Sequence, residues 1–263
     1  MGKKFYCQEN PASAFENFQD IFLPAVKIFR VDKNGVAVTI STSSFFVFFG
    51  VGSMRIELCG PLGVGKTTLA VKLASLLGGT HIKEPVETHP FLKPFYRNPE
   101  IHSFEKNMFF LLDYLHQIKS CQKGRFVFDH SAVVHRSYAA LNGIACGELP
   151  AFQALDRVIE EVGPPDLLIN LVCPADIVMG RIKKRGRSFE AQVPKQYVQS
   201  LMDEIQKQVT QVRPYMRVLD LDASAYDFEN SQADLDRAFD RIIGMLSNGV
   251  GRSVEPFSLQ RTA

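Results

Sequence analysis

Downstream of Met54, short apolar runs alternate with longer stretches whose apolar residues recur at helical spacing. The runs predict five strands that are buried on both faces, at 54–59, 80–83, 125–129, 166–172 and 217–221. The stretches between them predict helices at 66–77, 101–120, 133–142, 150–162, 174–185, 195–212 and 231–247. Because strands and helices alternate, we expect an α/β fold, a parallel five-stranded sheet with helices on both faces.

The first 53 residues do not follow this pattern and contain no motif. Residues 36–53 carry no charge, but the hydroxyl side chains among them argue against a transmembrane helix. No basic segment immediately precedes the apolar run, as a secretory signal would require. Two interpretations stay open: an extra strand or hairpin, or a segment absent from a working protein that starts at Met54. We therefore expect a domain at 54–248 and a loose polar tail at 249–263.

One motif points to a bound phosphate. Residues 60–67 read Gly-Pro-Leu-Gly-Val-Gly-Lys-Thr and match G-x-x-x-x-G-K-[ST], the loop of P-loop NTPases, between a predicted strand and a predicted helix. Its backbone N–H groups and the helix N-terminus face a phosphate. We expect Lys66 to reach the β- and γ-phosphates and Thr67 to bind Mg²⁺. The predicted ATP-binding residues here are Gly60, Pro61, Leu62, Gly63, Val64, Gly65, Lys66, Thr67 and Thr68.

Two predicted strands end in a carboxylate, at the edge of a parallel sheet where ligands bind. Glu84, followed by Pro85, could accept the proton of a hydroxyl that is being phosphorylated. Asp129 could be a second ligand of Mg²⁺. Each has a simpler alternative, since a Glu before a Pro is often a solvated turn residue and Asp often caps a helix.

A cationic cluster lies at the end of the predicted helix 174–185. Arg181 and Arg185 are four residues apart and share a helix face, and Arg187 follows Gly186. Such guanidinium groups could clamp phosphates. The alternatives are a solvated helix end or a nucleic-acid contact. A net charge of only +2 gives no reason to expect nucleic acid or an anionic membrane as a partner.

The five cysteines are scattered and odd in number, with no C-x-x-C pair. This pattern argues against a disulfide framework or a zinc site and suits a reducing, cytoplasmic location.

Taken in order, the motifs resemble those of the deoxynucleoside kinases over roughly residues 54–246. The matching pieces are Gly60–Thr67, Glu84-Pro85-Val86, Phe95-Tyr96, Pro99-Glu100, Ser103-Phe104, Asp129-His130-Ser131, Pro165–Ile169, Arg181 to Glu190, Val193-Pro194 with Tyr197, and Val218–Asp222. The resemblance implies transfer of the γ-phosphoryl group of ATP to the 5′-hydroxyl of a deoxynucleoside in nucleotide salvage. It also implies Mg²⁺ as cofactor and, since this family is often dimeric, a homodimer.

The resemblance assigns roles to residues. Glu84 is similar to the family's base at the 5′-hydroxyl, and Asp129 matches an acidic residue near Mg²⁺. Tyr96 and Glu190 match the pair that binds the sugar 3′-hydroxyl. The remaining matched catalytic or ATP-binding residues are Lys66, Arg181, Arg185 and Arg187.

Some positions depart from the family pattern. His130 stands where the family has an arginine near the transferring group and is expected to bind substrate there; Arg136 is a candidate substitute for that arginine. Asn107 aligns with the glutamine that reads the base, and Tyr114 and His135 align with an Arg/Asp pair of the base pocket. Because a hydrogen-bonding pocket strongly rejects the wrong base, the base preference does not follow from the resemblance.

Two other functions remain open at this point. A nucleoside monophosphate kinase resembling thymidylate kinase would share the loop and the arginine-bearing lid, but it would need a further cation for the acceptor phosphate. A nucleotide-binding regulatory protein without turnover is the other alternative, motivated by His130 and the altered base pocket. Glu84 and the Tyr96/Glu190 pair favour the nucleoside kinase.

Overall fold

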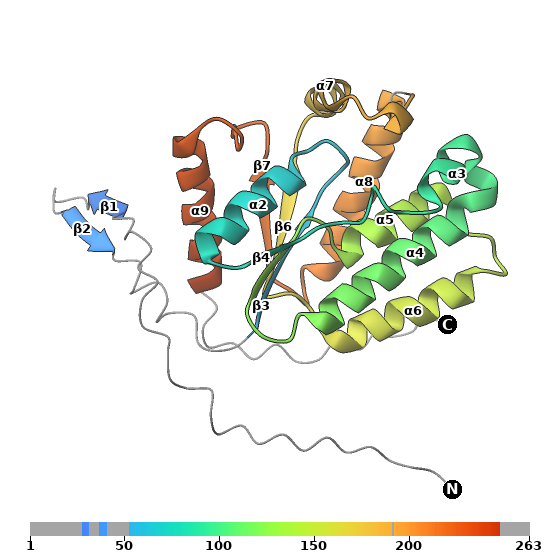
Figure 1. The fold of residues 1–263 in the computed structure, drawn as a ribbon, viewed down its shortest axis with the longest axis horizontal. Coiled ribbons are helices and arrows are strands. Elements are labelled where there is room, and N and C mark those ends of the chain that lie inside the picture. Colours follow the sequence, from blue (N-terminus) through green and yellow to red (C-terminus); the bar gives the residue numbers. More distant parts are fainter. Residues whose placement is uncertain (1–27, 32–36, 41–52, 191, 248–263) are drawn as a thin grey trace, which may run out of the picture. The chain divides into compact units, whose positions relative to one another are not determined.

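The computed structural model describes residues 28–31, 37–40, 53–190 and 192–247 (Figure 1). The chain divides into two units, Met1–Val51 and Gly52–Ala263. In the first, β1 (Ile28–Val31) and β2 (Ala37–Ile40) pair antiparallel. A hairpin is one of the two interpretations open for this stretch. The apolar run 45–49 and the tail 249–263 lie outside the described residues, and the start at Met54 stays a prediction. Within the described residues, no helix is long and apolar enough to cross a membrane.

The second unit is built on a five-stranded parallel sheet, as predicted. Its order is β4-β5-β3-β6-β7. The strands are β3 (Met54–Cys59), β4 (Thr80–Ile82), β5 (Arg125–Phe128), β6 (Leu167–Val172) and β7 (Val218–Asp222). Each lies within one residue of its predicted limits. The central strand β3 lies between β5 and β6, and the chain adds strands on both sides of it. At such a switch in strand order, a crevice opens at the carboxyl ends of the strands.

The seven predicted helices are confirmed, and the described residues form one more α-helix. The helices of the described part are α2 (Lys66–Leu77), α3 (Leu92–Arg97), α4 (Pro99–Ser120), α5 (Ala132–Asn142), α6 (Leu149–Val162), α7 (Ala175–Arg185), α8 (Lys195–Val212) and α9 (Gln232–Ser247). The additional helix, α3, has six residues and contains Pro94. It is too short to show a helical repeat in the sequence, and proline is a signal against a helix.

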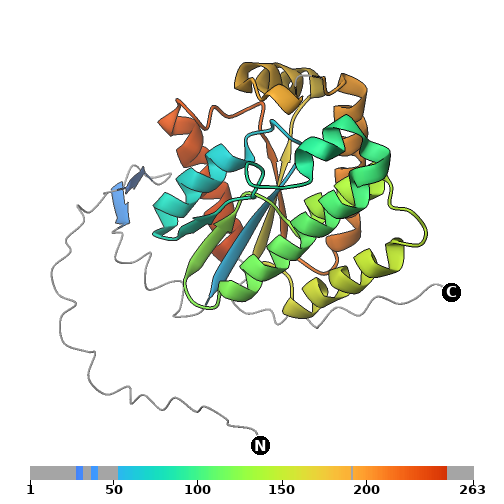
Figure 2. The ribbon, with the colours of Figure 1, turned by 45° about the vertical axis from the view of Figure 1, so that its right-hand side comes forward.

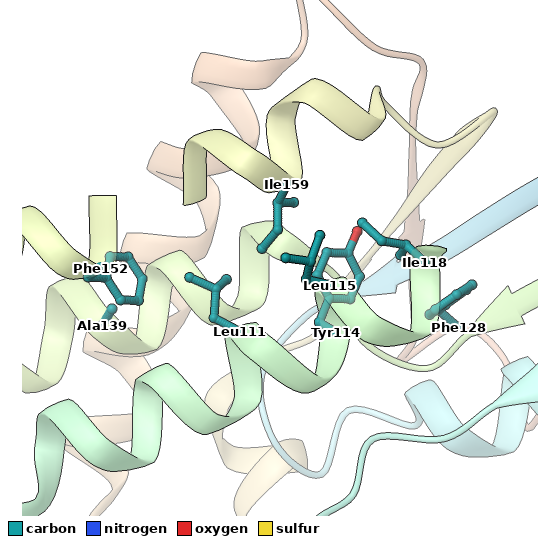
Figure 3. Close-up of a cluster of buried hydrophobic side chains, with 8 residues drawn as sticks. All are labelled: Leu111, Tyr114, Leu115, Ile118, Phe128, Ala139, Phe152 and Ile159. Atoms are coloured by element: carbon teal, nitrogen blue, oxygen red, sulfur yellow. The ribbon is translucent and has the colours of Figure 1, made fainter. Parts of the chain in front are cut away.

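The helices cover both faces of the sheet. Figures 1 and 2 show α2 and α9 on one face and α4, α5 and α8 on the other, with α6 packed outside α4. A buried cluster joins α4, α5, α6 and β5 (Figure 3). Its members are Leu111, Tyr114, Leu115, Ile118, Phe128, Ala139, Phe152 and Ile159. Burial of such side chains contributes about 25 cal/mol per Å² of apolar surface, so this layer holds α4 firmly beside the crevice.

Candidate active site

A cavity of about 950 Å³ opens at the carboxyl ends of the strands. It brings together most of the residues that the sequence predicted for the site. The predicted residues that line it are Leu62, Gly63, Gly65, Lys66, Thr67, Thr68, Glu84, Tyr96, Asp129, Arg181, Arg185, Arg187 and Glu190. The predicted residues that are not part of its lining are Gly60, Pro61, Val64, Asn107 and His130. All five are buried.

The loop between β3 and α2 needs its glycines. Gly60 and Gly65 have φ of 138° and 111°, in the region that L side chains rarely adopt. A Cβ on Gly60 would lie 2.7 Å from the carbonyl oxygen of Leu171, which is closer than atoms can pack. The Lys66 ammonium donates to the carbonyl oxygens of Gly60 and Pro61 at 2.8 and 3.0 Å. The lysine is therefore folded over the loop, with its charge at the cavity.

Asp129 connects two other predicted residues. Its Oδ2 accepts from the Thr67 hydroxyl at 2.7 Å, and its Oδ1 accepts from the Glu84 backbone N–H at 2.8 Å. His81 Nε2 lies 3.3 Å from Oδ2. Burial by itself would raise the pKa of Asp129, but the contact with His81 and the hydrogen bond from Thr67 outweigh it and hold the pKa at about 2. The carboxylate is ionised at neutral pH, and Ser131 rather than Asp129 caps α5.

Glu84 leaves β4 at the wall of the cavity. Burial raises the pKa of its carboxyl group to about 7, with Lys66 lowering it and Asp129 raising it further. A carboxylate with a pKa near the working pH is suited to take up and release a proton. The structure thus places a carboxyl group with a raised pKa in the lining of the cavity, where the charge of Lys66 acts on it.

The arginines of α7 and the loop after it fall into two groups. Arg181 donates to the backbone oxygens of Val64 and Ala223, both at 2.8 Å, and so joins the phosphate loop to the chain after β7. Arg185 and Arg187 both contact the buried Glu190 carboxylate, at 2.5 and 3.4 Å. The lid cations and the predicted sugar-binding carboxylate therefore form one network at the cavity.

The rest of the lining includes residues that sequence reasoning missed. Lys106 and the aromatic residues Phe110, Tyr138 and Tyr197 line the cavity beside Tyr96. The sequence held one signal for Lys106. It occupies a buried position on α4, between Ser103 and Phe110 in the stripe that packs inward, and a lysine is almost never fully buried without a partner.

The loop after β7 was also missed. Tyr226 and Phe228 stack with ring centroids 5.6 Å apart and an interplanar angle of 10°, and both line the cavity. Phe228 lies 3.7 Å from where a Cβ of Gly65 would be. Its ring thus stands next to the phosphate loop. The sequence of this loop has no periodicity, so only the fold shows that it belongs to the site.

His130 is completely buried, and its Nδ1 lies 3.1 Å from His135 Nε2. Burial lowers the pKa of His130 to about 4, although Asp129 opposes this, so the ring is neutral at pH 7. Arg136 does not replace the missing arginine. It binds Asp156 through Nε at 2.8 and 2.9 Å and Glu160 at 2.9 Å, all on the side of α6. That hypothesis is therefore wrong.

The positions aligned with the family's base-reading residues are buried and do not line the cavity. Asn107 is buried and its Nδ2 donates to Ser103 Oγ at 3.3 Å. The Tyr114 hydroxyl donates to Glu57 Oε1 at 2.6 Å. A direct contact between Asn107 and a base stays a prediction. Neither Asn107 nor Tyr114 is part of the cavity lining.

Comparison with known proteins gives a consistent result. A family model described as deoxynucleoside kinase matches residues 56–246. The deoxyguanosine kinase of Bacillus subtilis is 29% identical over 191 residues, covering 69% of this chain and 92% of the relative. The deoxyadenosine/deoxycytidine kinase of Bacillus subtilis is 28% identical over 203 residues, covering 73% of this chain and 92% of the relative. The structure of the deoxyadenosine kinase from M. mycoides with bound dCTP has a TM-score of 0.62 at 22% identity, covering 73% of this chain and all of the other.

Proposed function

The chain belongs to the deoxynucleoside kinase family and is an ATP-dependent phosphotransferase, and we propose that this cavity performs the transfer to the 5′-hydroxyl of a deoxynucleoside. The observation that carries the assignment is the position of Glu84. Its carboxylate lines the same cavity as Lys66 and the Thr67–Asp129 pair, and its pKa is about 7. Proton acceptor, phosphate-binding lysine and metal-binding oxygens thus share one space.

The donor phosphates occupy the loop 60–67 at the N-terminus of α2. Backbone N–H groups and the positive end of the helix dipole face them. On binding, Lys66 exchanges the carbonyl oxygens of Gly60 and Pro61 for phosphate oxygens. Arg185 at the end of α7 and Arg187 in the following loop approach the phosphates. Their positive charge stabilises the negative charge that spreads over the transferred group.

The acceptor lies on the opposite side of the transferred group. Glu84 takes the proton of the 5′-hydroxyl as the oxygen attacks phosphorus. Its raised pKa lies near neutral pH, where a general base works best. Tyr96 and Glu190 hold the sugar 3′-hydroxyl. Because Arg185 and Arg187 both contact Glu190, sugar binding and lid position are linked through one carboxylate. This arrangement orients the hydroxyl for in-line transfer.

Mg²⁺ fits the residues that are present. Hard oxygen atoms of Thr67 and Asp129 stand 2.7 Å apart, and Mg²⁺ in such enzymes takes one or two protein oxygens and completes its shell with phosphate and water. Within the described residues, no group of three or more His, Cys, Asp or Glu side chains forms a fuller metal site. When bound, Mg²⁺ neutralises phosphate charge.

The two other functions are not favoured. The relatives are named as deoxynucleoside kinases. A regulatory protein without turnover would have no use for a carboxyl group whose pKa is raised to about 7 in the cavity.

We also propose that the enzyme is cytoplasmic and forms a homodimer. Ile101 and Leu112 on α4 are 63% and 58% exposed, which gives the dimer an apolar surface. Light scattering of the purified protein tests it.

The test of the function is a transfer assay with Mg·ATP. The acceptors are the four deoxynucleosides, the four ribonucleosides and thymidine monophosphate. We expect turnover of at least one deoxynucleoside, and Glu84→Gln is expected to lower kcat by about 10²- to 10⁴-fold. Glu161→Gln, an exposed glutamate of α6, is the matched control and is expected to retain activity. Turnover of the monophosphate alone, or no turnover with ATP bound, would contradict the proposal.

A further inference from the structure

One residue of the cavity lining is a buried lysine. Lys106 on α4 is 3% exposed and lines the cavity. Among the described residues, no hydrogen bond or ion pair involves its ammonium group. The ammonium instead lies over two rings, 4.4 Å from the centroid of Phe95 and 4.9 Å from that of Tyr138.

The burial of Lys106 disfavours its charged form and so lowers its pKa. Burial lowers the pKa of Lys106 to about 7, and the charge of Glu84 only partly opposes this. An ammonium group carries three hydrogen-bond donors and no acceptor. Contact with two ring faces compensates for part of the lost hydration, but all three donors remain open. A ligand that offers an acceptor at this point would recover the rest.

The surroundings of Lys106 show what kind of ligand part reaches it. The rings of Phe95 and Tyr138 flank the Lys106 ammonium, and the charge of Glu84 also acts on it. Tyr96, Phe110 and Tyr197 add further aromatic side chains to the same cavity lining. Aromatic walls suit a flat ring, and phosphate would avoid them. The nucleobase is the planar part of a deoxynucleoside, so its polar edge is the group that the Lys106 ammonium meets.

We propose that Lys106 determines base specificity by donating a hydrogen bond to the carbonyl oxygen at position 6 of a purine or position 4 of a pyrimidine. The substrate class is then a deoxynucleoside with an oxo group at that position. An amino group at the same position is itself a donor and cannot pair with the protonated lysine. Sites that are built to hydrogen-bond a substrate reject the mismatched analogue strongly for this reason. The inference rests on the proposed function, since it needs a nucleoside in this cavity.

Matched pairs of nucleosides test it. Deoxyinosine and deoxyadenosine share the purine ring and differ at position 6, and deoxyuridine and deoxycytidine differ in the same way at position 4. We expect the wild type to have a higher kcat/KM for the oxo member of the pair that it accepts. The ratio within a pair is the measured quantity, because the protonation of Glu84 affects both members equally.

Lys106→Met removes the donors and keeps the length of the side chain. We expect it to lower kcat/KM for the oxo nucleoside by about 30- to 100-fold and for the amino nucleoside by less than about 3-fold. Lys106→Gln, whose amide both donates and accepts, is expected to recover part of the activity with the oxo nucleoside. Lys119→Met, an exposed lysine of the same helix, is the control and is expected to leave the ratio unchanged.

Three outcomes would overturn the inference. A wild type that prefers the amino member contradicts it directly. An equal fall for both members in Lys106→Met would show that the lysine acts on Glu84 or on the sugar. An unchanged ratio with a lower melting temperature would show a purely structural role over the rings of Phe95 and Tyr138. Absence of turnover by the wild type with every nucleoside is a different result, because it would remove the proposed function itself.

Discussion

The Thr67 hydroxyl and the Asp129 carboxylate are 2.7 Å apart, although 62 positions separate them in the chain. One belongs to the first turn of α2 and the other follows β5. They meet because β3 and β5 are parallel neighbours, so the segments that leave their carboxyl ends lie at the same edge of the sheet. The pair gives the site two hard oxygen atoms next to the phosphate loop.

Asp129→Asn is expected to weaken Mg²⁺ binding. The Asn amide oxygen can still accept from Thr67 or from the Glu84 backbone, but the negative charge is lost. We expect the Mg²⁺ concentration for half-maximal activity to rise by about 10- to 100-fold, as is usual when groups that support a metal are altered. Titration of activity with Mg²⁺ measures it. Thr67→Ser, which keeps the hydroxyl, is the control, and an unchanged Mg²⁺ dependence in Asp129→Asn would contradict the assignment.

The raised pKa of Glu84 predicts the pH dependence of catalysis. The carboxylate must be ionised to accept a proton, so kcat/KM is expected to decline as pH falls below the pKa of about 7. The decline approaches about tenfold per pH unit well below the pKa. Initial rates between pH 5.5 and 8.5, with a nucleoside that does not titrate in this range, give the profile. A profile that stays level down to pH 5 would mean that Glu84 has an ordinary pKa or is not the base.

Arg136 is expected to stabilise the fold and to take no part in catalysis. The side chains of Arg136, Asp156 and Glu160 are 17% to 20% exposed. Arg136→Met therefore leaves two poorly hydrated carboxylates. Breaking a buried pair costs about 3–5 kcal/mol, and this partial exposure reduces the expected loss in the free energy of unfolding to about 2 kcal/mol. Urea unfolding measures it, and kcat is expected to stay within about twofold of the wild type. A large loss of kcat with unchanged stability would show that Arg136 reaches the transferred group.

The buried histidines predict a loss of stability in mild acid. Burial lowers the pKa of His130 and of His89 to about 4, and that of His135 well below its usual value. In the unfolded chain these histidines bind protons near pH 6.5, whereas in the folded chain they do not. Their contribution to the free energy of unfolding is therefore fully present above pH 6.5 and is lost between pH 6.5 and 4. Each histidine contributes a slope of about 1.4 kcal/mol per pH unit.

Urea unfolding at a series of pH values tests this prediction. The variant His130→Gln keeps a polar partner for His135. It is expected to reduce the slope of the free energy of unfolding against pH by about 1.4 kcal/mol per pH unit, which corresponds to one proton. If the free energy of unfolding were constant between pH 6.5 and 4.5, the histidines would be protonated in the folded state or accessible to water.

The sequence by itself determined the order of the elements and the phosphate loop. Strands buried on both faces are continuous apolar runs, and the loop 60–67 is a local pattern whose glycines are required by the backbone, as Gly60 shows against Leu171. The carboxylates Glu84 and Asp129 could also be placed, because the end of a parallel strand lies at the ligand edge. These features depend on residues that are close in the chain.

Only the tertiary structure decided which side chains face the cavity. Lys106 and Asn107 are neighbours on one helix, yet Lys106 lines the cavity and Asn107 is buried beside it. Arg136 turns to Asp156 because α6 packs nearby, and His130 is held against His135, which lies five residues further along the chain on α5. The direction of a side chain depends on the packing of its helix against neighbours that are distant in sequence, and periodicity distinguishes a buried face from an exposed one but not a cavity from a core.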